Sequence, residues 1–272
     1  MSARLHFGTS GWNTKDWIGP FYPAGTKPPD MLAHYGRVFG SVEVDASYYG
    51  IPRASSIEAW RTRSADNFRL SLKTPSTVTH ERRFVNADAY FSAFLERVRP
   101  LGDKLGVILI QCPPDFAPAR ESRAALFSFL ETELRADFAF ALELRDPRWY
   151  DDALFAHARA NGFTLAVTEG THSDLALAAR IVDELVRDPP APHAYIRWLG
   201  EQTLPHYDRV QLDRSGSHDA WERMIRSLQT VCTDIYAYAS NDFEGFAPAT
   251  VRAMLARLGE PMPPETGELR LL

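Results

Sequence analysis

Phe138-Ala-Phe-Ala-Leu-Glu-Leu-Arg145 is a short apolar run followed closely by a proline, and this pattern predicts a β-strand. Side chains alternate between the two faces of a strand, so Glu143 and Arg145 share one face. The opposite face carries Phe140, Leu142 and Leu144. An apolar face of this kind suits contact with helices, and the charged pair is then expected to point to the other side of the sheet.

Seven further strand-like runs occur along the chain, and an amphipathic segment follows each of the eight runs. The predicted strands are Leu5–Ser10, Val42–Ser47, Phe68–Lys73, Gly106–Gln111, Phe138–Arg145, Thr164–Thr168, His193–Trp198 and Asp234–Ser240. The predicted helices are Asp30–Phe39, Ser56–Arg63, Ala89–Pro100, Arg120–Leu134, Asp152–Asn161, Asp174–Arg187, His218–Val231 and Ala247–Leu258. Eight strand-then-helix units predict parallel strands joined by crossover helices, closed as a (β/α)8 TIM barrel.

A doubly wound open sheet is the alternative fold, but it favours a glycine-rich phosphate turn after an early strand. Neither a GxGxxG nor a GxxxxGKS pattern occurs in the sequence. The 272 residues match the length of a barrel that forms one domain, so we predict a single domain covering residues 1–272. The proline-rich segment 259–272 is expected to be an irregular tail draped over the barrel.

The composition is that of an ordinary globular protein, with 45% hydrophobic and 24% charged residues. A net charge of −5 argues mildly against a surface built to bind a phosphate backbone. Cys112 and Cys232 are far apart in the sequence and form no CxxC pair, which suits a reducing compartment. No signal-peptide core follows Met1, and no run approaches the ~20 apolar residues of a membrane span. We therefore expect a cytoplasmic protein without a membrane partner.

Polar side chains gather near the carboxyl ends of the predicted strands, although a barrel interior is expected to hold mainly Val, Ile, Leu and small residues. They are Glu43, Asp45, Lys73, Gln111, Glu143, Arg145, Arg197, Ser240, Asn241 and Asp242. Alternation places Glu43 and Asp45 on one face, as it does Glu143 and Arg145. A purely structural ion network is the alternative reading of this set, although apolar replacements of buried ion pairs are often neutral or stabilising. We therefore favour a functional pocket.

The loops that follow the first and third strands are long, and such loops carry function in this fold. His80 lies in the second of them, beside Glu81, Arg82 and Arg83. We expect it to supply general acid or base chemistry or a phosphate contact, with a solvated loop histidine as the alternative. Trp12 and Tyr48 belong to a group of aromatic residues at the strand ends, and we expect them to wall the pocket.

A divalent metal is a further alternative, because oxygen-rich barrel mouths bind such ions. The candidate ligands are Glu43, Asp45, Glu143, Glu169 and Asp242, joined by His80, His172 or His206. No HxH or HExxH spacing is present, and Lys73 and Arg145 compete for the same carboxylates. We therefore expect neither a metal site nor a cofactor.

Several motifs together resemble the YecE-like family, also called domain of unknown function 72. They are Gly8-Thr9-Ser10-Gly11-Trp12, Phe21-Tyr22-Pro23, Val42-Glu43-Val44, Lys73-Thr74-Pro75, Thr79-His80-Glu81-Arg82-Arg83, Gln111-Cys112-Pro113-Pro114, Glu143-Leu144-Arg145 with Pro147 and Trp149, Tyr195-Ile196-Arg197, and Asn241-Asp242 with Gly245-Phe246-Ala247-Pro248. The resemblance spans nearly the whole chain and independently implies a TIM barrel. It implies no reaction, because the activity of the family is not established.

The chain departs from the family pattern in three places. Trp198-Leu199-Gly200 stands where the family usually has Leu-His-Gly, and Thr168-Glu169 stands where it often has Asp-Ser. Ser240 replaces an Asn of the eighth strand. The missing histidine weakens any role in metal binding or acid/base chemistry that depends on it, and the three changes together imply altered specificity.

We predict an enzyme, a hydrolase, lyase or isomerase, that acts by acid/base chemistry on a small polar, anionic or carbohydrate-like substrate. The predicted catalytic residues are Glu143, Glu43 and His80, and the predicted substrate-binding residues are Lys73, Arg145, Arg197, Gln111, Asn241, Asp242, Tyr48 and Trp12. One alternative is a metal-dependent protein that binds or cleaves nucleic acid, with Arg82 and Arg83 on phosphate. A second alternative is a non-catalytic ligand binder. The sequence does not predict an oligomeric state.

Overall fold

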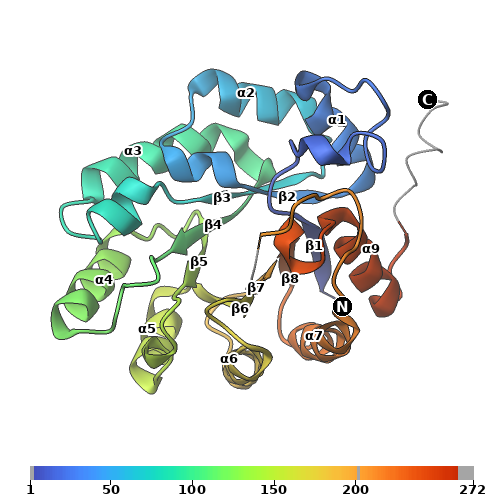
Figure 1. Cartoon of the computed structure of the whole chain (residues 1–272). Helices are drawn as coiled ribbons and strands as arrows, with labels where there is room; N and C mark the ends of the chain where they lie inside the picture. The colour runs from blue at the N-terminus through green and yellow to red at the C-terminus, as the bar shows by residue number, and fades with distance from the viewer. Residues whose placement is uncertain (1–2, 201–202, 263–272) are drawn as a thin grey trace.

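The computed structural model describes residues 3–200 and 203–262, and within them eight parallel strands alternate with helices (Figure 1). The strands are β1 (Arg4–Thr9), β2 (Ser41–Val44), β3 (Arg69–Lys73), β4 (Leu105–Gln111), β5 (Ala139–Glu143), β6 (Thr164–Gly170), β7 (His193–Gly200) and β8 (Asp234–Ala239). The helices are α1 (Pro28–Val38), α2 (Ala54–Arg63), α3 (Asp88–Val98), α4 (Arg120–Glu133), α5 (Asp152–Asn161), α6 (Leu175–Arg187), α7 (Ser215–Leu228), α8 (Asn241–Glu244) and α9 (Ala247–Leu258).

The strands form one sheet in the order β1-β8-β7-β6-β5-β4-β3-β2, with the helices outside it, as Figure 1 shows. The predicted (β/α)8 barrel is therefore confirmed in a nearly closed form. Between β1 and β2 the Gly11 amide donates directly to the Glu43 carbonyl at 2.9 Å, but at Thr9 a hydroxyl group takes the place of a ladder hydrogen bond. The Thr9 amide donates to Tyr35 Oη at 2.9 Å, and Tyr35 Oη donates to the Ser41 carbonyl at 3.0 Å. Gly8 allows this approach, since a Cβ there would lie 1.9 Å from the Ser41 oxygen.

Local signals explain where the helices on the active side begin. Asp151 and Asp174 cap α5 and α6, and their carboxylates accept from the amides of Leu154 and Leu177. The side chain of Ser240 caps α8 in the same way. These caps fix the loops after β5, β6 and β8, and those loops border the candidate site.

The core has two layers, one between sheet and helices and one inside the barrel. Phe140, Leu142 and Leu144 are buried in the outer layer, as alternation predicted. The prediction that aliphatic and small residues fill the interior was wrong in part, because Tyr195 and Tyr238 occupy it as well. The hydroxyl group of Tyr238 lies 2.6 Å from Ser41 Oγ and 2.8 Å from Ser71 Oγ. Serines on neighbouring strands thus satisfy the hydrogen bonding of the buried phenol, which offsets the cost of its burial.

Several predicted boundaries shift by a few residues, among them the ends of three strands that border the site. β2 ends at Val44 because the backbone turns into a 3-10 helix over Asp45–Tyr49, so Asp45 follows its strand. β5 ends at Glu143, so Arg145 follows its strand as well. Conversely, β6 continues to Gly170. Residues 260–262 belong to no helix or strand, and the rest of the predicted tail, 263–272, lies outside the described residues.

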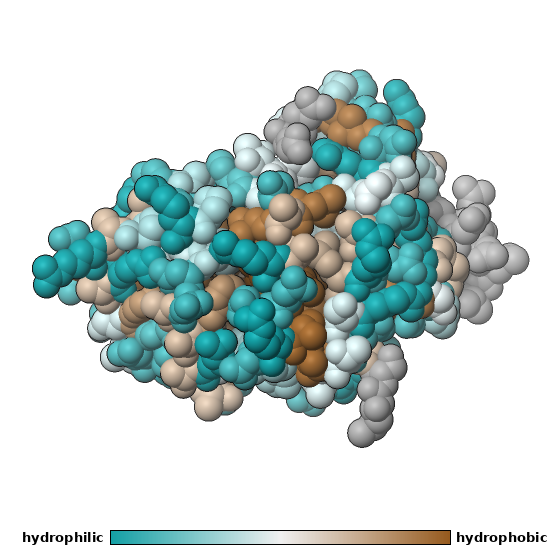
Figure 2. Space-filling view, turned by 90° about the horizontal axis from the view of Figure 1, so that it is seen from below, coloured by the Kyte–Doolittle hydropathy of each residue, from teal (hydrophilic) through white to brown (hydrophobic). Residues whose placement is uncertain are grey.

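The molecular surface over α4 to α7, seen from below in Figure 2, is mostly hydrophilic, with small hydrophobic patches among polar side chains. None of the helices in the described part of the chain has the length and apolar character needed to cross a bilayer.

Candidate functional site

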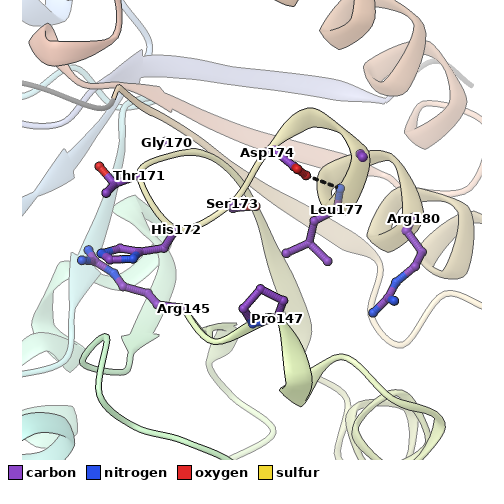
Figure 3. A pocket seen from close by; sticks show the side chains of 10 residues that line it. Arg145, Pro147, Gly170, Thr171, His172, Ser173, Asp174, Leu177 and Arg180 are labelled. Carbon is purple, nitrogen blue, oxygen red and sulfur yellow. Dashed lines mark hydrogen bonds between the residues drawn. The ribbon is translucent and has the colours of Figure 1, made fainter.

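Three connected hollows open at the carboxyl ends of the strands. The mouth hollow, about 370 Å³, is lined by Ser10, Asp45, Tyr48, Tyr49, Lys73, His80, Gln111, Arg145, Arg197, Leu199 and Ser240. The inner hollow, about 240 Å³, lies between the ends of β5 to β8 and includes Glu143, Thr168 and Asp242. The α6 hollow, about 850 Å³, lies beside the N-terminus of α6 (Figure 3). Arg145 lines all three, so it stands where they meet.

Arg197 on β7 joins the two predicted catalytic carboxylates. Its Nε and Nη2 donate to Glu43 at 2.9 and 2.7 Å, and its Nη1 donates to Glu143 at 2.7 Å. The same Nη1 lies 3.3 Å from Gln111 Oε1. Arg197 is only 2% exposed. Three strands thus contribute to one buried ion cluster of one guanidinium and two carboxylates, which matches the convergence expected from side-chain alternation.

Two further hydroxyl groups complete the hydrogen bonding of Glu43. Tyr195 Oη donates to Glu43 at 2.6 Å, and Ser10 Oγ donates at 3.1 Å. The sequence interpretation overlooked both residues. Tyr195 shares the inward face of β7 with Arg197, and that parity could have identified it.

The ion cluster keeps both carboxylates charged. Burial is the largest single effect and raises the pKa of Glu43 and of Glu143, but the charge of Arg197, the other nearby cations and the hydrogen bonds together leave each pKa below its usual value. Burial lowers the pKa of Arg197, and the two carboxylates more than reverse that effect. A glycosidase acid needs a carboxyl group with a raised pKa. Neither glutamate meets that need, so this geometry disfavours two-carboxylate hydrolysis and gives both glutamates a positioning role.

Arg145 is held at one nitrogen and open at the others. Its Nε donates to Glu143 Oε1 at 3.3 Å, and its side chain is 24% exposed. Neither terminal nitrogen donates a hydrogen bond to any residue in the part of the chain that the structure describes. A guanidinium fork fixed at its base and open at its tip suits a carboxylate or phosphate.

Lys73 ends β3 and points into the mouth hollow. Its Nζ lies 3.1 Å from Asp45 Oδ1 and 5.3 Å from the centre of the Tyr48 ring. The Tyr48 ring in turn meets the His80 ring edge to face, with centroids 5.1 Å apart. Cation, phenol and imidazole therefore form one wall of the hollow.

His80 sits in a single turn of π-helix, Thr77–Glu81, a conformation frequent at functional sites. Its Nδ1 lies 2.8 Å from the buried hydroxyl group of Thr79. Burial and the charges of Arg145 and Lys73 lower its pKa, so the ring is neutral at pH 7. Just beyond, Arg83, Phe84 and Asn86 have positive φ angles. Such strained backbone persists where the surroundings hold it, here by the packing of Phe84 in the core.

Two predicted binding residues, Asn241 and Trp12, do not line the mouth hollow. Asn241 is turned into the loop packing: it accepts from Trp17 Nε1 at 3.1 Å and from the Ala247 amide at 3.2 Å. Trp12 lines a separate hollow between α1 and α2, where its ring lies 6.1 Å from that of Trp60. Trp12 lies in a loop and Asn241 begins the short helix α8, and the strand pattern fixed the direction of neither side chain.

The oxygen ligands considered for a metal do not converge. Glu169 points outward and accepts from Ser217 Oγ at 2.7 Å and from Trp221 Nε1 at 2.5 Å, both on α7. Asp242 accepts from Tyr207 Oη at 2.5 Å. Across residues 3–200 and 203–262, no three side chains of His, Cys, Asp or Glu are grouped so that they could hold an ion. The nucleic-acid alternative was predicted to be metal-dependent, and the described residues offer it no such group of ligands.

Comparisons with known proteins by sequence and by structure point to the same family. A family model described as protein of unknown function DUF72 matches residues 6–268. The chain is 26% identical over 277 residues to the UPF0759 protein YunF of Bacillus subtilis, covering 93% of this chain and 94% of that protein. It is 27% identical over 146 residues to the UPF0759 protein YecE of Escherichia coli, where the match spans 54% of this chain and 50% of the relative. A solved DUF72 protein from Thermotoga maritima superposes with a TM-score of 0.75 at 21% identity, covering 94% of this chain and 100% of the other.

Proposed function

This chain belongs to the DUF72 family, and we propose that its barrel mouth binds a small anionic substrate on which His80 performs acid/base chemistry. The observation that carries the proposal is the pairing of an open arginine fork with a neutral imidazole in one hollow. Arg145 and His80 both line the mouth hollow, and the charge of Arg145 is one cause of the lowered pKa of His80.

Binding rests on Arg145 and Lys73. Arg145 lines the hollow with terminal nitrogens that make no hydrogen bond to the described residues, and Lys73 adds a second cation to the lining. Arg197 is engaged by Glu43 and Glu143, so its part in the proposal is to hold those carboxylates beneath the site. Glu143 in turn fixes the base of Arg145. A fixed cation loses little conformational entropy when an anion binds.

Proton transfer falls to His80. A general base must be unprotonated near pH 7 and within reach of the substrate. His80 meets the first condition through its lowered pKa. In the proposal the ring proton is on Nδ1, which donates to Thr79 Oγ1, so Nε2 is the unprotonated nitrogen that acts as the base. Hydrolysis, elimination and isomerisation of a hydroxylated anion all need such a transfer, so the reaction class stays open among the three. Sugar phosphates and hydroxy acids fit this chemistry.

A non-catalytic ligand binder is the second candidate, and one observation favours it. Glu43 and Glu143 are tied into ion pairs, which removes two of the three predicted catalytic groups from proton transfer. Of the three predicted catalytic residues, only His80 then remains available for proton transfer, so its role decides between an enzyme and a binder.

Titration of the whole chain with inorganic phosphate and sulfate, followed by thermal shift and calorimetry, tests the binding half. We expect Arg145→Gln to weaken binding at least tenfold, as for the loss of a charge-assisted hydrogen bond. The matched control is Arg148→Gln, whose guanidinium is 72% exposed and paired with Asp146. Equal losses of anion affinity in the two variants would contradict an anion site at Arg145.

A panel of sugar phosphates and hydroxy acids tests the catalytic half. We expect turnover of one class, abolished in His80→Gln with the dissociation constant for that compound nearly unchanged. Turnover that survives His80→Gln would remove His80 from the mechanism. Binding throughout the panel without turnover would leave the binder as the function.

A further inference from the structure

The α6 hollow, about 850 Å³, adjoins the proposed site and exceeds what an inorganic anion needs. Its walls are the turn at Pro147 and the loop from Gly170 to Ser173, with α6 behind (Figure 3). Arg145 and Arg180 stand on opposite sides of it in that view, with Pro147 and Leu177 between them. The proposed function uses only the Arg145 end.

Arg180 repeats the arrangement of Arg145. Its Nη2 donates to the carbonyl of Tyr150 at 2.6 Å. Its Nε and Nη1 donate to no other residue within 3–200 and 203–262, and the residue is exposed. Each of the two arginines is thus anchored by one nitrogen and leaves the others for a ligand. Arg148 differs, because two of its nitrogens are paired with Asp146.

The wall between the two arginines is held by its own backbone and combines apolar side chains with one carboxylate, that of Asp174. Ser173 and Gly170 exchange two backbone hydrogen bonds, and Ser173 Oγ donates to the Thr168 carbonyl at 2.8 Å. The carboxylate of Asp174 is turned to the amide of Leu177, the dashed line in Figure 3, where it caps α6. The ring of Pro147 and the side chain of Leu177 offer apolar contact between the two arginines, and the helix cap directs one oxygen of Asp174 to the Leu177 amide.

We infer that the α6 hollow is a second subsite for the substrate of the proposed function, and that the substrate is an elongated dianion. One anionic group lies on Arg145 and the other on Arg180, with an uncharged spacer across Pro147 and Leu177. This inference rests on the proposed function, since it shares Arg145 with it. Two carboxylates or two phosphates fit the same chemistry.

The test uses linear α,ω-dicarboxylates of increasing length and the monocarboxylates of the same lengths, titrated against the whole chain by calorimetry and thermal shift. We expect one intermediate length to bind at least tenfold more tightly than its monocarboxylate. Arg180→Gln should abolish that advantage and leave the monocarboxylate unchanged. Arg145→Gln should weaken both series, and Arg148→Gln, which removes the same charge nearby, should change neither. Repeating the titration with alkanediol bisphosphates then shows which anion is preferred.

The outcomes separate the two proposals. Monocarboxylate binding that depends on Arg145, without any length optimum or effect of Arg180→Gln, overturns the second subsite and leaves the proposed function standing. A dianion advantage that persists in Arg180→Gln also overturns the subsite. Binding indifferent to Arg145→Gln, or no binding of any probe, overturns both.

Discussion

At the scale of single residues, Arg197 links the fold to the candidate site. Its guanidinium is buried between Glu43 and Glu143, and removal of one partner from such a cluster leaves uncompensated charge in the interior. Glu143 in turn accepts a hydrogen bond from Arg145 Nε and so restrains that side chain at the mouth. The ion cluster therefore acts as a support for an open cation.

Replacement of Arg197 by Gln should be among the most destabilising polar substitutions in the chain. We expect a loss of about 3–5 kcal/mol in the free energy of unfolding, because two buried carboxylates lose their shared cation. Urea denaturation measures it, with Arg148→Gln, an exposed arginine, expected to stay close to the wild type. A loss no larger than that of the control would mean that the carboxylates find water or other partners.

The titration of His80 reports on the electrostatics of the mouth. Burial comes first among the causes that lower its pKa, and the charges of Arg145 and Lys73 follow. We therefore expect an NMR midpoint below the ordinary value of 6.5, with the ring neutral at pH 7 and protonated only as the pH falls through that lower midpoint. Arg145→Gln should move the midpoint upward part of the way, as should a bound anion. A midpoint at or above 6.5 in the free protein contradicts the proposed base.

At the scale of elements, periodicity explains which predictions succeeded. All eight strands and all eight long helices were predicted near their observed positions, because each carries an apolar pattern of period two or of helical spacing. The same parity brought Glu43, Glu143 and Arg197 together. Trp12 and Asn241 were misplaced because they lie beyond the strand ends, where contacts such as Trp17 with Asn241 set the direction. Arg180 was overlooked because a charged residue on an exposed helix face carries no signal of its own.

The seam between β1 and β2 relies on one hydroxyl group at Thr9 and Ser41. Tyr35→Phe leaves the Thr9 amide and the Ser41 carbonyl without their shared partner, so we expect a loss of about 1–3 kcal/mol in the free energy of unfolding. Tyr49→Phe, at a ring 85% exposed, is the matched control and should change little. Amide hydrogen exchange at Thr9 should accelerate in Tyr35→Phe alone. Unchanged stability would show that the two strands pair directly once the hydroxyl group is gone.

At the scale of the whole molecule, the net charge is −5, and the connected hollows hold cations and carboxylates together. Lys73, Arg145 and Arg180 line them, as do Asp45, Asp174 and Asp242. A mixed lining of this kind attracts an anion only at short range, at nitrogens that no carboxylate holds, while the acidic remainder of the chain repels polyanions. We therefore expect a small dianion as the ligand in preference to nucleic acid.

The outer core layer is continuous from Ala3 to Leu258, which predicts that the barrel unfolds as one domain. Four buried tryptophans test this directly, since the rings of Trp198 and Trp221 are in contact with each other while Trp17 and Trp149 lie at other places in the core. We expect urea transitions followed by tryptophan fluorescence and by far-ultraviolet circular dichroism to coincide, since both report loss of the same core. Chains of this length often populate intermediates, so coincidence is a demanding result. Fluorescence that changes in a separate earlier step would locate a subdomain around the tryptophans involved and contradict the single-domain prediction.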